Sequence, residues 1–269
     1  YVVTSDLTGI AWRFPLIEMQ GVPLRNYIVQ KWSNISAFCP DPSDMLIATY
    51  PKAGTTWTQE IVDLLLHNGD EEACKRASTS DRFPFLEIQY PPPIPSGKVI
   101  YVARNAKDNL VSYYHFDRMN QAQPQPGPWE EYIQKFMRGK VAWGSWYDHV
   151  KDYWKEREKR NILYLFFEDL KKDPRREVER IMRYMDLSVT DDVIDKIVQL
   201  TSFKNMRDNP MANYTFIPKI MFDHSISPFM RRGEVGDWTN HFTPAQSQMF
   251  DEDYARQMAD VDIPFCTSI

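Results

Sequence analysis

Short apolar runs alternate with amphipathic segments along most of this chain. Three apolar runs read as buried strands, at residues 45–50 (MLIATY), 98–103 (KVIYVA) and 162–167 (ILYLFF). Segments with one apolar face, expected to be helices, follow at residues 56–67, 106–120, 175–185, 191–200 and 244–259. Because strands alternate with helices, the pattern predicts an α/β fold with a central parallel sheet flanked by helices.

Composition narrows the class of protein without changing that fold. The chain of 269 residues has a net charge of −5, which disfavours a nucleic-acid partner. No run reaches the roughly 18 apolar residues of a membrane span, and the start lacks a signal-peptide pattern. Cys39, Cys74 and Cys266 show neither disulfide nor zinc spacing. We therefore expect a single domain over residues 1–269, cytoplasmic, without a metal, a nucleic-acid partner or a membrane partner.

The loop after the first predicted strand has the character of an anion site. Parallel α/β sheets bind ligands at the carboxyl ends of their strands, where residues 51–57 lie. A tight turn at Gly54 leads into a helix N-terminus, whose free N–H groups attract anions, and Lys52 adds a cation. The lysine precedes the glycine, so this is not the Walker A motif of a P-loop kinase. A plain strand-to-helix turn with a solvated lysine remains the alternative.

Two further segments offer cations to the same edge of the sheet. Arg104 ends the second strand, in residues 101–108 (YVARNAKD), and Ser112 lies two helical turns beyond. Residues 227–238 (SPFMRRGEVGDW) bring two adjacent arginines followed by glycines. Arginine suits two-pronged phosphate binding, although each segment alone fits a surface ion pair or a basic loop.

Taken in this order, the three segments resemble the cytosolic sulfotransferase family, and within it the phenol (aryl) branch. The resemblance runs from about Gly21 to the last residue, through YPKAGTTW, YVARNAKD, GSWYDHV, NPMANYT, DHSISPFMRRG and GDW. It implies a P-loop-like nucleotide-binding sulfotransferase fold. It also implies metal-free transfer of a sulfonyl group from PAPS to the hydroxyl or amine of a small aromatic acceptor, with release of PAP.

The resemblance also implies roles for individual residues. Lys52 would stabilise charge on the bridging oxygen of the donor, and Ser112, the second catalytic residue, would restrain Lys52 until the acceptor arrives. The implied nucleotide-binding residues are Lys52, Ala53, Gly54, Thr55, Thr56, Trp57, Arg104, Ser112, Phe167, Thr201, Phe203, Phe229, Met230, Arg231, Arg232 and Gly233. The implied acceptor pocket, for which ordinary core packing is the alternative, consists of Phe85, Ile88, Phe116, Met119 and Tyr214.

The largest departure from the family pattern concerns the catalytic base. Family members carry a Lys-Thr-His segment, with the histidine as base, between the first two matching blocks. Here residues 94–97 (IPSG) continue directly into Lys98, and neither His115 nor His149 obviously replaces that histidine. Either a segment is left out of the sequence between Gly97 and Lys98, or the protein binds PAPS and PAP without turnover. We favour the first, because losing a central strand would cost much of a core.

Smaller departures affect nucleotide affinity and assembly. Phe167 stands where many relatives have tyrosine, which removes one hydroxyl contact worth about 1 kcal/mol. The short dimer contact of the family is altered at Thr239, Thr243 and Gln248, so we expect a monomer or a weak homodimer. The acidic pair at residues 168–169 is expected in a turn.

Overall fold

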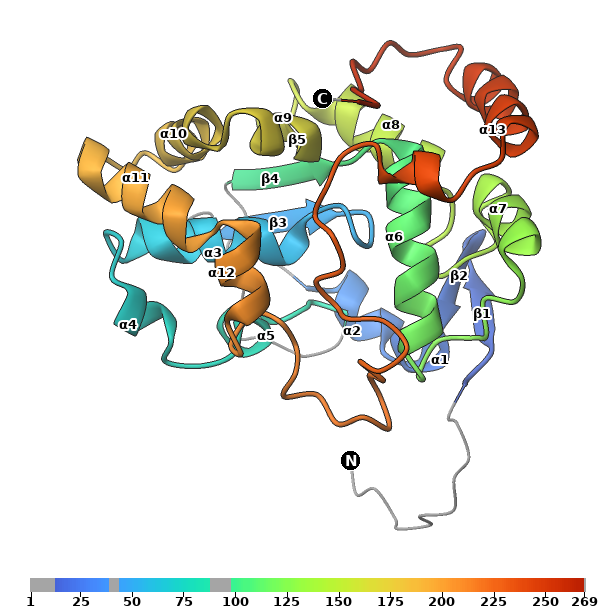
Figure 1. The fold of residues 1–269 in the computed structure, drawn as a ribbon, viewed down its shortest axis with the longest axis horizontal. Helices are drawn as coiled ribbons and strands as arrows, with labels where there is room; N and C mark the ends of the chain where they lie inside the picture. Colours follow the sequence, from blue (N-terminus) through green and yellow to red (C-terminus); the bar gives the residue numbers. More distant parts are fainter. Residues whose placement is uncertain (1–12, 39–43, 88–97, 269) are drawn as a thin grey trace.

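A three-stranded parallel sheet forms the centre of the computed structural model, which describes residues 13–38, 44–87 and 98–268 (Figure 1). The strands are β3 (Met45–Thr49), β4 (Lys98–Ala103) and β5 (Ile162–Phe166), and β4 lies between the other two. The register sets Ala48 beside Tyr101 and Tyr101 beside Tyr164. The α/β fold with a parallel sheet predicted from the sequence is confirmed.

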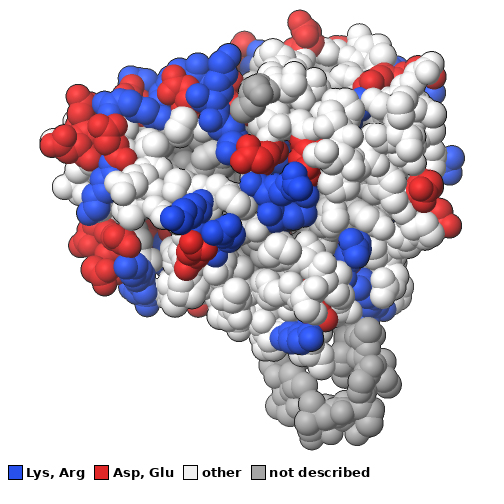
Figure 2. Space-filling model, in the orientation of Figure 1, with Lys and Arg blue, Asp and Glu red and all other residues white. Residues whose placement is uncertain are grey.

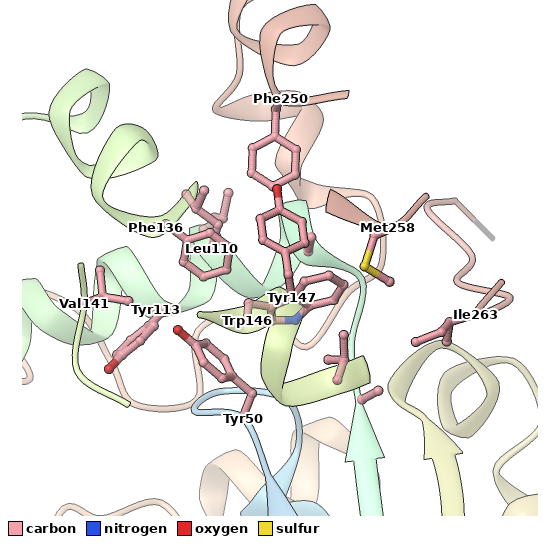
Figure 3. Packing of buried hydrophobic residues seen from close by; sticks show 14 of the residues in the cluster. Tyr50, Leu110, Tyr113, Phe136, Val141, Trp146, Tyr147, Phe250, Met258 and Ile263 are labelled. Carbon is pink, nitrogen blue, oxygen red and sulfur yellow. The ribbon is translucent and has the colours of Figure 1, made fainter. Parts of the chain in front are cut away.

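An aromatic core covers one face of the sheet. Tyr101 and Tyr164 project from this face into a cluster that includes Tyr113, Phe136 and Trp146. Figure 3 shows several of these rings, with Tyr147 between Trp146 and Phe250. The helices that contribute to this core are α6 (Ala106–Met119), α7 (Trp129–Met137), α8 (Trp146–Glu156) and α13 (Pro244–Gln257). Aromatic packing on this scale is a large source of apolar burial.

An aliphatic core covers the opposite face. Ile100, Val102 and Leu165 alternate with the residues of the aromatic face, as the two-residue period of a strand requires. They pack against helices α3 (Thr55–Leu66), α9 (Phe167–Lys172), α10 (Pro174–Tyr184) and α11 (Asp191–Leu200). Both faces are therefore covered, which is typical of parallel sheets.

The remaining elements surround this sandwich. Strands β1 (Leu16–Met19) and β2 (Val22–Arg25) form a separate antiparallel hairpin. Short helices complete the fold: α1 (Asn26–Gln30), α2 (Trp32–Ser36), α4 (Glu71–Cys74), α5 (Thr79–Arg82), α12 (Phe203–Asp208) and the 3₁₀ helix η1 (Asp237–Asn240). Across the described residues, no helix has the length and apolar character needed to cross a membrane. Cys74 and Cys266 are unpaired thiols, and Cys39 lies outside the described residues.

Polar caps explain why several helices begin where they do. The side chain of Asn105 accepts a hydrogen bond from the backbone N–H of Asp108 at the start of α6. Thr243 and Gln246 form a reciprocal capping box at the start of α13. Such caps satisfy N–H groups that have no partner inside the helix, and each contributes about 1 kcal/mol.

The turn predicted at residues 168–169 is wrong, because both residues lie in α9. Glu168 is buried there, and its Oε1 accepts hydrogen bonds from the backbone N–H of Asn105 at 2.8 Å and from its Nδ2 at 2.9 Å. Acidic residues are favourable in the first turn of a helix, where they interact with the positive end of its dipole. The partner of Glu168 lies 63 residues away, so the local sequence does not indicate the bond.

Candidate nucleotide and acceptor site

A cavity of about 890 Å³ lies at the carboxyl end of the sheet. Cavities of this size are at the upper end of the range for small-molecule sites. Among the predicted nucleotide-binding residues its wall contains Lys52, Gly54, Thr55, Thr56, Trp57, Arg104, Ser112, Phe167, Thr201, Phe203, Phe229, Met230, Arg231, Arg232 and Gly233. Ala53 is buried beside them. The structure thus brings three segments that are distant in sequence into one wall.

The loop between β3 and α3, residues 50–54, has an unusual backbone. Lys52 and Gly54 both have positive φ, at 69° and 123°. A side chain at position 54 would place its Cβ 3.3 Å from Cδ2 of Phe167, which favours glycine there. A lysine in the left-handed region costs conformational energy, and such strain is typical of ligand-binding loops. Asn109 Nδ2 donates to the carbonyl of Pro51 at 2.8 Å and ties this loop to α6.

Lys52 lies between the cationic part of the cavity and its aromatic part. Its Nζ is 3.5 Å from the ring centroid of Phe229 and 4.8 Å from that of Phe116. Burial, and then the nearby charges of Arg104 and Arg231, lower the pKa of Lys52 to about 7. Nζ also donates to the carbonyl of Phe229 at 3.5 Å. An anion bound here would favour the charged form of the lysine.

Ser112 contributes to the same wall, and it also lines a small adjoining cavity together with Lys52, Phe116 and Arg231. Within the described residues, the hydrogen bond of Lys52 goes to Phe229 and not to Ser112. Restraint of Lys52 by Ser112 therefore stays a prediction.

Arg104 is the most buried cation of the wall, with 5% of its surface exposed. Its Nη2 donates to the carbonyl of Glu234 at 3.0 Å and its Nη1 to the carbonyl of Lys52 at 3.3 Å. Its guanidinium also lies 4.2 Å from the ring centroid of Phe167, whereas its buried Nε has no partner. Among the described residues no carboxylate forms an ion pair with Arg104, and a buried guanidinium with an unsatisfied donor suits an anionic ligand.

Arg231 and Arg232 are held by one carboxylate. Asp237 forms ion pairs with both arginines: Nη2 of Arg231 lies 2.5 Å from its Oδ2, and Nη1 of Arg232 lies 3.1 Å from its Oδ1. The buried Nε of Arg231 has no hydrogen-bond partner. Asp108 anchors the same loop to α6, because its carboxylate accepts from the backbone N–H groups of Gly236 and Trp238. Figure 2 shows a group of Lys and Arg side chains near the middle of the molecular face, bordered above by Asp and Glu side chains and below by uncharged residues.

Three aromatic rings are available for a planar base at the nucleotide end. Trp57 and Phe167 pack edge to face, with ring centroids 5.5 Å apart. Phe203, the first residue of α12, lies against Gly233 so closely that an added Cβ would meet its Cδ2 at 2.3 Å. Thr201, just before α12, donates its hydroxyl to the carbonyl of Ile197.

The opposite end of the cavity is an aromatic pocket. Tyr214 packs on Phe229 with ring centroids 4.2 Å apart, and Phe116 packs against Phe222 at 5.6 Å. Phe85 also lines this cavity. Of the other two predicted acceptor contacts, Met119 is fully buried outside the cavity wall and Ile88 lies outside the described residues.

Sequence reasoning missed several residues of the wall, including Phe222, His149, Arg25 and Glu87. His149 is the one histidine that the described residues contribute to the wall of the 890 Å³ cavity. Its Nδ1 lies 2.8 Å from the hydroxyl of Tyr101, and burial lowers its pKa to about 4. Only the motif GSWYDHV marks it in the sequence, and no local pattern marks Arg25 or Glu87.

Outside the cavity, three side chains lie as close together as the ligands of a metal ion. Ligand atoms of Asp63, His67 and Cys74 lie within 4.8 Å of one another. The carboxylate of Asp63, however, is already bound by the guanidinium groups of Arg76 and Arg82. Two cations in contact with the central ligand compete with a metal ion, so this group is best explained as a structural ion-pair network.

Comparison with known proteins identifies the family. A family model described as the sulfotransferase domain matches residues 42–94 and 91–262. Sulfotransferase 1C2 of rabbit is 48% identical over 293 positions, covering 97% of this chain and 99% of the rabbit protein. The human protein of the same name is 47% identical, with 99% of both chains covered.

Solved structures show the same fold. A mouse sulfotransferase complexed with PAP superimposes with a TM-score of 0.73 at 28% identity, over 92% of this chain and 96% of that one. A retinol dehydratase in complex with androsterone and PAP superimposes with a TM-score of 0.85 at 20% identity, over 95% of this chain and 92% of that one. The second likeness concerns the fold alone.

The comparisons also locate the segment that this chain lacks. Only 97% of the 269 residues take part in the 293-position rabbit alignment, so the rabbit protein has positions without a counterpart here. The two family matches meet at residues 91–94, and the sequence runs on without a break from Gly97 to Lys98. Gly97 itself lies outside the described residues. In the described part of the chain, β3 pairs with β4 alone.

Family, fold and cavity agree with one another. The domain match covers most of the chain, and the rabbit and human relatives extend over nearly all of it. This chain therefore belongs to the sulfotransferase family, the enzymes that transfer a sulfonyl group from PAPS to a small acceptor.

Proposed function

We propose that the protein transfers the sulfonyl group of PAPS to the hydroxyl of a small phenol and releases PAP. The observation that carries this proposal is the position of Lys52. Its Nζ lies near the rings of Phe116 and Phe229, and the charges of Arg104 and Arg231 are close enough to lower its pKa. This cation could therefore contact both a polyanionic donor and a flat aromatic acceptor.

The donor fits the cationic end of the cavity. Residues 52–56 would bind the phosphosulfate through Lys52 and the free N–H groups of the first turn of α3. Arg104, Ser112 and Arg231 would bind the 3′-phosphate. Trp57 would lie on the adenine. The mouse sulfotransferase solved with PAP supports this assignment of the nucleotide.

The acceptor fits the aromatic end. Phe85, Phe116 and Tyr214 offer ring surfaces that suit a planar phenol. The oxygen of that phenol would lie near Lys52, whose Nζ is close to the Phe116 ring. In the reaction the phenol oxygen bonds to sulfur, and the bond from sulfur to the bridging oxygen breaks. The electron pair stays on the phosphate of PAP, where Lys52 neutralises the new charge. The phenolic proton passes to solvent before the transfer.

The fate of that proton sets an expectation for the acceptor. The printed sequence has no counterpart of the segment in which the family resemblance places a histidine base, so for a protein made from that sequence we expect the acceptor to react as its phenolate. Acidic phenols, which are ionised near neutral pH, should therefore be the best acceptors. A base in the site would instead favour phenols of ordinary pKa.

A series of substituted phenols tests this proposal. Turnover with PAPS at pH 7 should be at least roughly tenfold faster for a phenol with a pKa near 7 than for one with a pKa near 10, in line with their phenolate fractions. Lys52→Met should abolish turnover of both, whereas Lys140→Met, at an exposed lysine paired with Glu18, should not. Absence of turnover in the unmodified protein, with PAP still bound, would refute the proposal.

A further inference from the structure

Two histidines that take no part in the proposed reaction lie side by side at the edge of the nucleotide site. His115 belongs to α6, and His241 follows the 3₁₀ helix η1. Their Nε2 atoms are 3.1 Å apart, and both side chains are partly buried. His115 also lines the small cavity that adjoins the main one, together with Ser112 and Arg231. The histidine pair therefore borders the subsite proposed for the 3′-phosphate.

The partners at the two ends of the pair determine where its protons lie. A carbonyl oxygen can only accept, so Nδ1 of His241, which is 3.1 Å from the carbonyl oxygen of Asp237, carries a proton. An arginine can only donate, so Nδ1 of His115, which is 3.5 Å from Nη1 of Arg118, accepts. The proton of a neutral His115 is then on Nε2, which donates to Nε2 of His241. Both rings are neutral in this arrangement, and no two N–H groups face each other.

The surroundings of the pair favour neutral rings. Burial, and then the charge of Arg231, lower the pKa of His115 to about 4. This ring therefore carries no charge at neutral pH, and its Nδ1 remains an acceptor. The hydrogen bonds consequently run in one direction, from Arg118 through the two rings to Asp237.

This series of hydrogen bonds ends at the residue that holds two arginines of the nucleotide site. Asp237 is buried, and its carboxylate forms ion pairs with Arg231 and Arg232. Nδ1 of His241 lies 3.8 Å from Oδ2 of Asp237, the oxygen that faces Arg231. Asn240 donates to the other carboxylate oxygen at 3.0 Å. Because both arginines are bound to Asp237, whatever fixes that side chain also fixes the cations offered to the nucleotide.

We propose that His115 and His241 are positioning residues for the 3′-phosphate of PAPS and PAP. They act through Asp237, which they hold so that Arg231 keeps the orientation this phosphate requires. Groups that are ordered before binding lose less freedom when the ligand arrives, and they therefore bind it more tightly. This inference rests on the proposed function, which assigns the 3′-phosphate to Arg231, and it adds two residues that support that subsite.

The preference for PAP over adenosine 5′-phosphate measures this subsite, because the two nucleotides differ only in the 3′-phosphate. Calorimetric titration would give both dissociation constants, and their ratio is the preference. His241→Phe retains a ring but removes both nitrogen atoms, and it should lower the preference roughly tenfold. His115→Phe should lower it about threefold, because the donor to Asp237 is retained. A general loss of packing would instead weaken both nucleotides alike and leave the preference unchanged.

A conservative variant and a matched histidine separate positioning from packing. His241→Asn retains an amide N–H near the position of Nδ1, so the preference should stay within about threefold of that of the unmodified protein. His67→Phe is the matched control. Nδ1 of His67 lies 2.8 Å from the carbonyl oxygen of Asp63, four residues earlier, but His67 does not line the cavity. This variant should leave the preference unchanged, and thermal unfolding would show that every variant is folded.

The positions of the protons provide a test that does not depend on the nucleotide. Nitrogen-15 NMR distinguishes the two neutral forms of a histidine ring, and the variants assign the signals among the five histidines of the chain. At pH 7 we expect the proton on Nε2 in His115 and on Nδ1 in His241. A proton on Nε2 in both rings, or a preference that neither phenylalanine variant at these two positions changes, would overturn the inference.

The same measurements separate this inference from the proposed function. Turnover of a phenol by a protein whose preference is unchanged in both variants would retain the proposed function and refute the role of the histidine pair. A preference that falls as expected, in a protein that turns over no phenol, would refute the proposed function and retain the role of the pair.

Discussion

Gly233→Ala should displace the ring of Phe203 into the nucleotide end of the cavity. Gly233 has a φ of 64°, and an added Cβ would lie 2.3 Å from Cδ2, 2.8 Å from Cε2 and 3.1 Å from Cγ of Phe203. Three neighbouring ring atoms at these distances leave no room for the methyl group, so the ring must move. Both Phe203 and Gly233 line the cavity, which offers the displaced ring the space that the nucleotide would occupy.

The free-energy cost of Gly233→Ala has two parts. An alanine in the left-handed region costs roughly 1–2 kcal/mol, partly offset by about 0.4–1 kcal/mol from the reduced freedom of the unfolded chain. Overpacking adds typically 1–3 kcal/mol. If the Phe203 ring relieves the overpacking by moving into the cavity, PAP must displace the ring again in order to bind. The affinity for PAP then falls roughly 5- to 150-fold.

Gly236→Ala is the matched control. Gly236 has a φ of 86°, but its added Cβ would meet only the carbonyl oxygen of Thr267, at 3.7 Å. Calorimetric titration with PAP should therefore show a large loss for Gly233→Ala and a loss of less than about threefold for Gly236→Ala. In a protein that already carries Phe203→Ala, Gly233→Ala should lower the affinity for PAP less than it does in the unmodified protein. Equal losses at the two glycines would refute the argument.

Other properties lead to separate predictions. Because the pKa of Lys52 is lowered to about 7, the free protein carries a largely neutral lysine at pH 8, and binding of anionic PAP should take up close to one proton. Titrations in two buffers of different ionisation enthalpy should detect this uptake, Lys52→Met should abolish it, and affinity should fall as pH rises above about 7. Phe167→Tyr should tighten PAP binding by about 1 kcal/mol through a new hydroxyl contact, and an unchanged dissociation constant would contradict this. Light scattering at micromolar concentration should give a mass near the 31.7 kDa of one chain, and the mass of a tight dimer would contradict the predicted monomer or weak dimer.

Elements with a strong local pattern were predictable from the sequence. Strand β4 and helix α11 begin and end at the predicted residues, because each apolar pattern is flanked by polar or turn-forming residues. Helix α13 begins at the expected Pro244, where the Thr243 cap and the proline both favour a first turn. The donor loop and the arginine segments were likewise recognisable, because residues close in sequence supply each of them.

Features that depend on contacts between distant segments were not predictable. The burial of Glu168 depends on Asn105, and the position of Met119 depends on which face of α6 packs into the core. β3 reads as a buried strand, yet all five of its residues are only half-buried, because within the described residues it has a neighbour on one side alone.

The sequence by itself determined the strand–helix alternation, the anion-binding loops and the family, because these depend on short-range patterns of residue type. The tertiary structure decided where Lys52 lies relative to Phe116 and Phe229. That position depends on segments that are distant in sequence: the loop after β3, helix α6 and residues 227–233. Periodicity shows which face of a segment is buried, but only packing decides which residues of other segments that face meets.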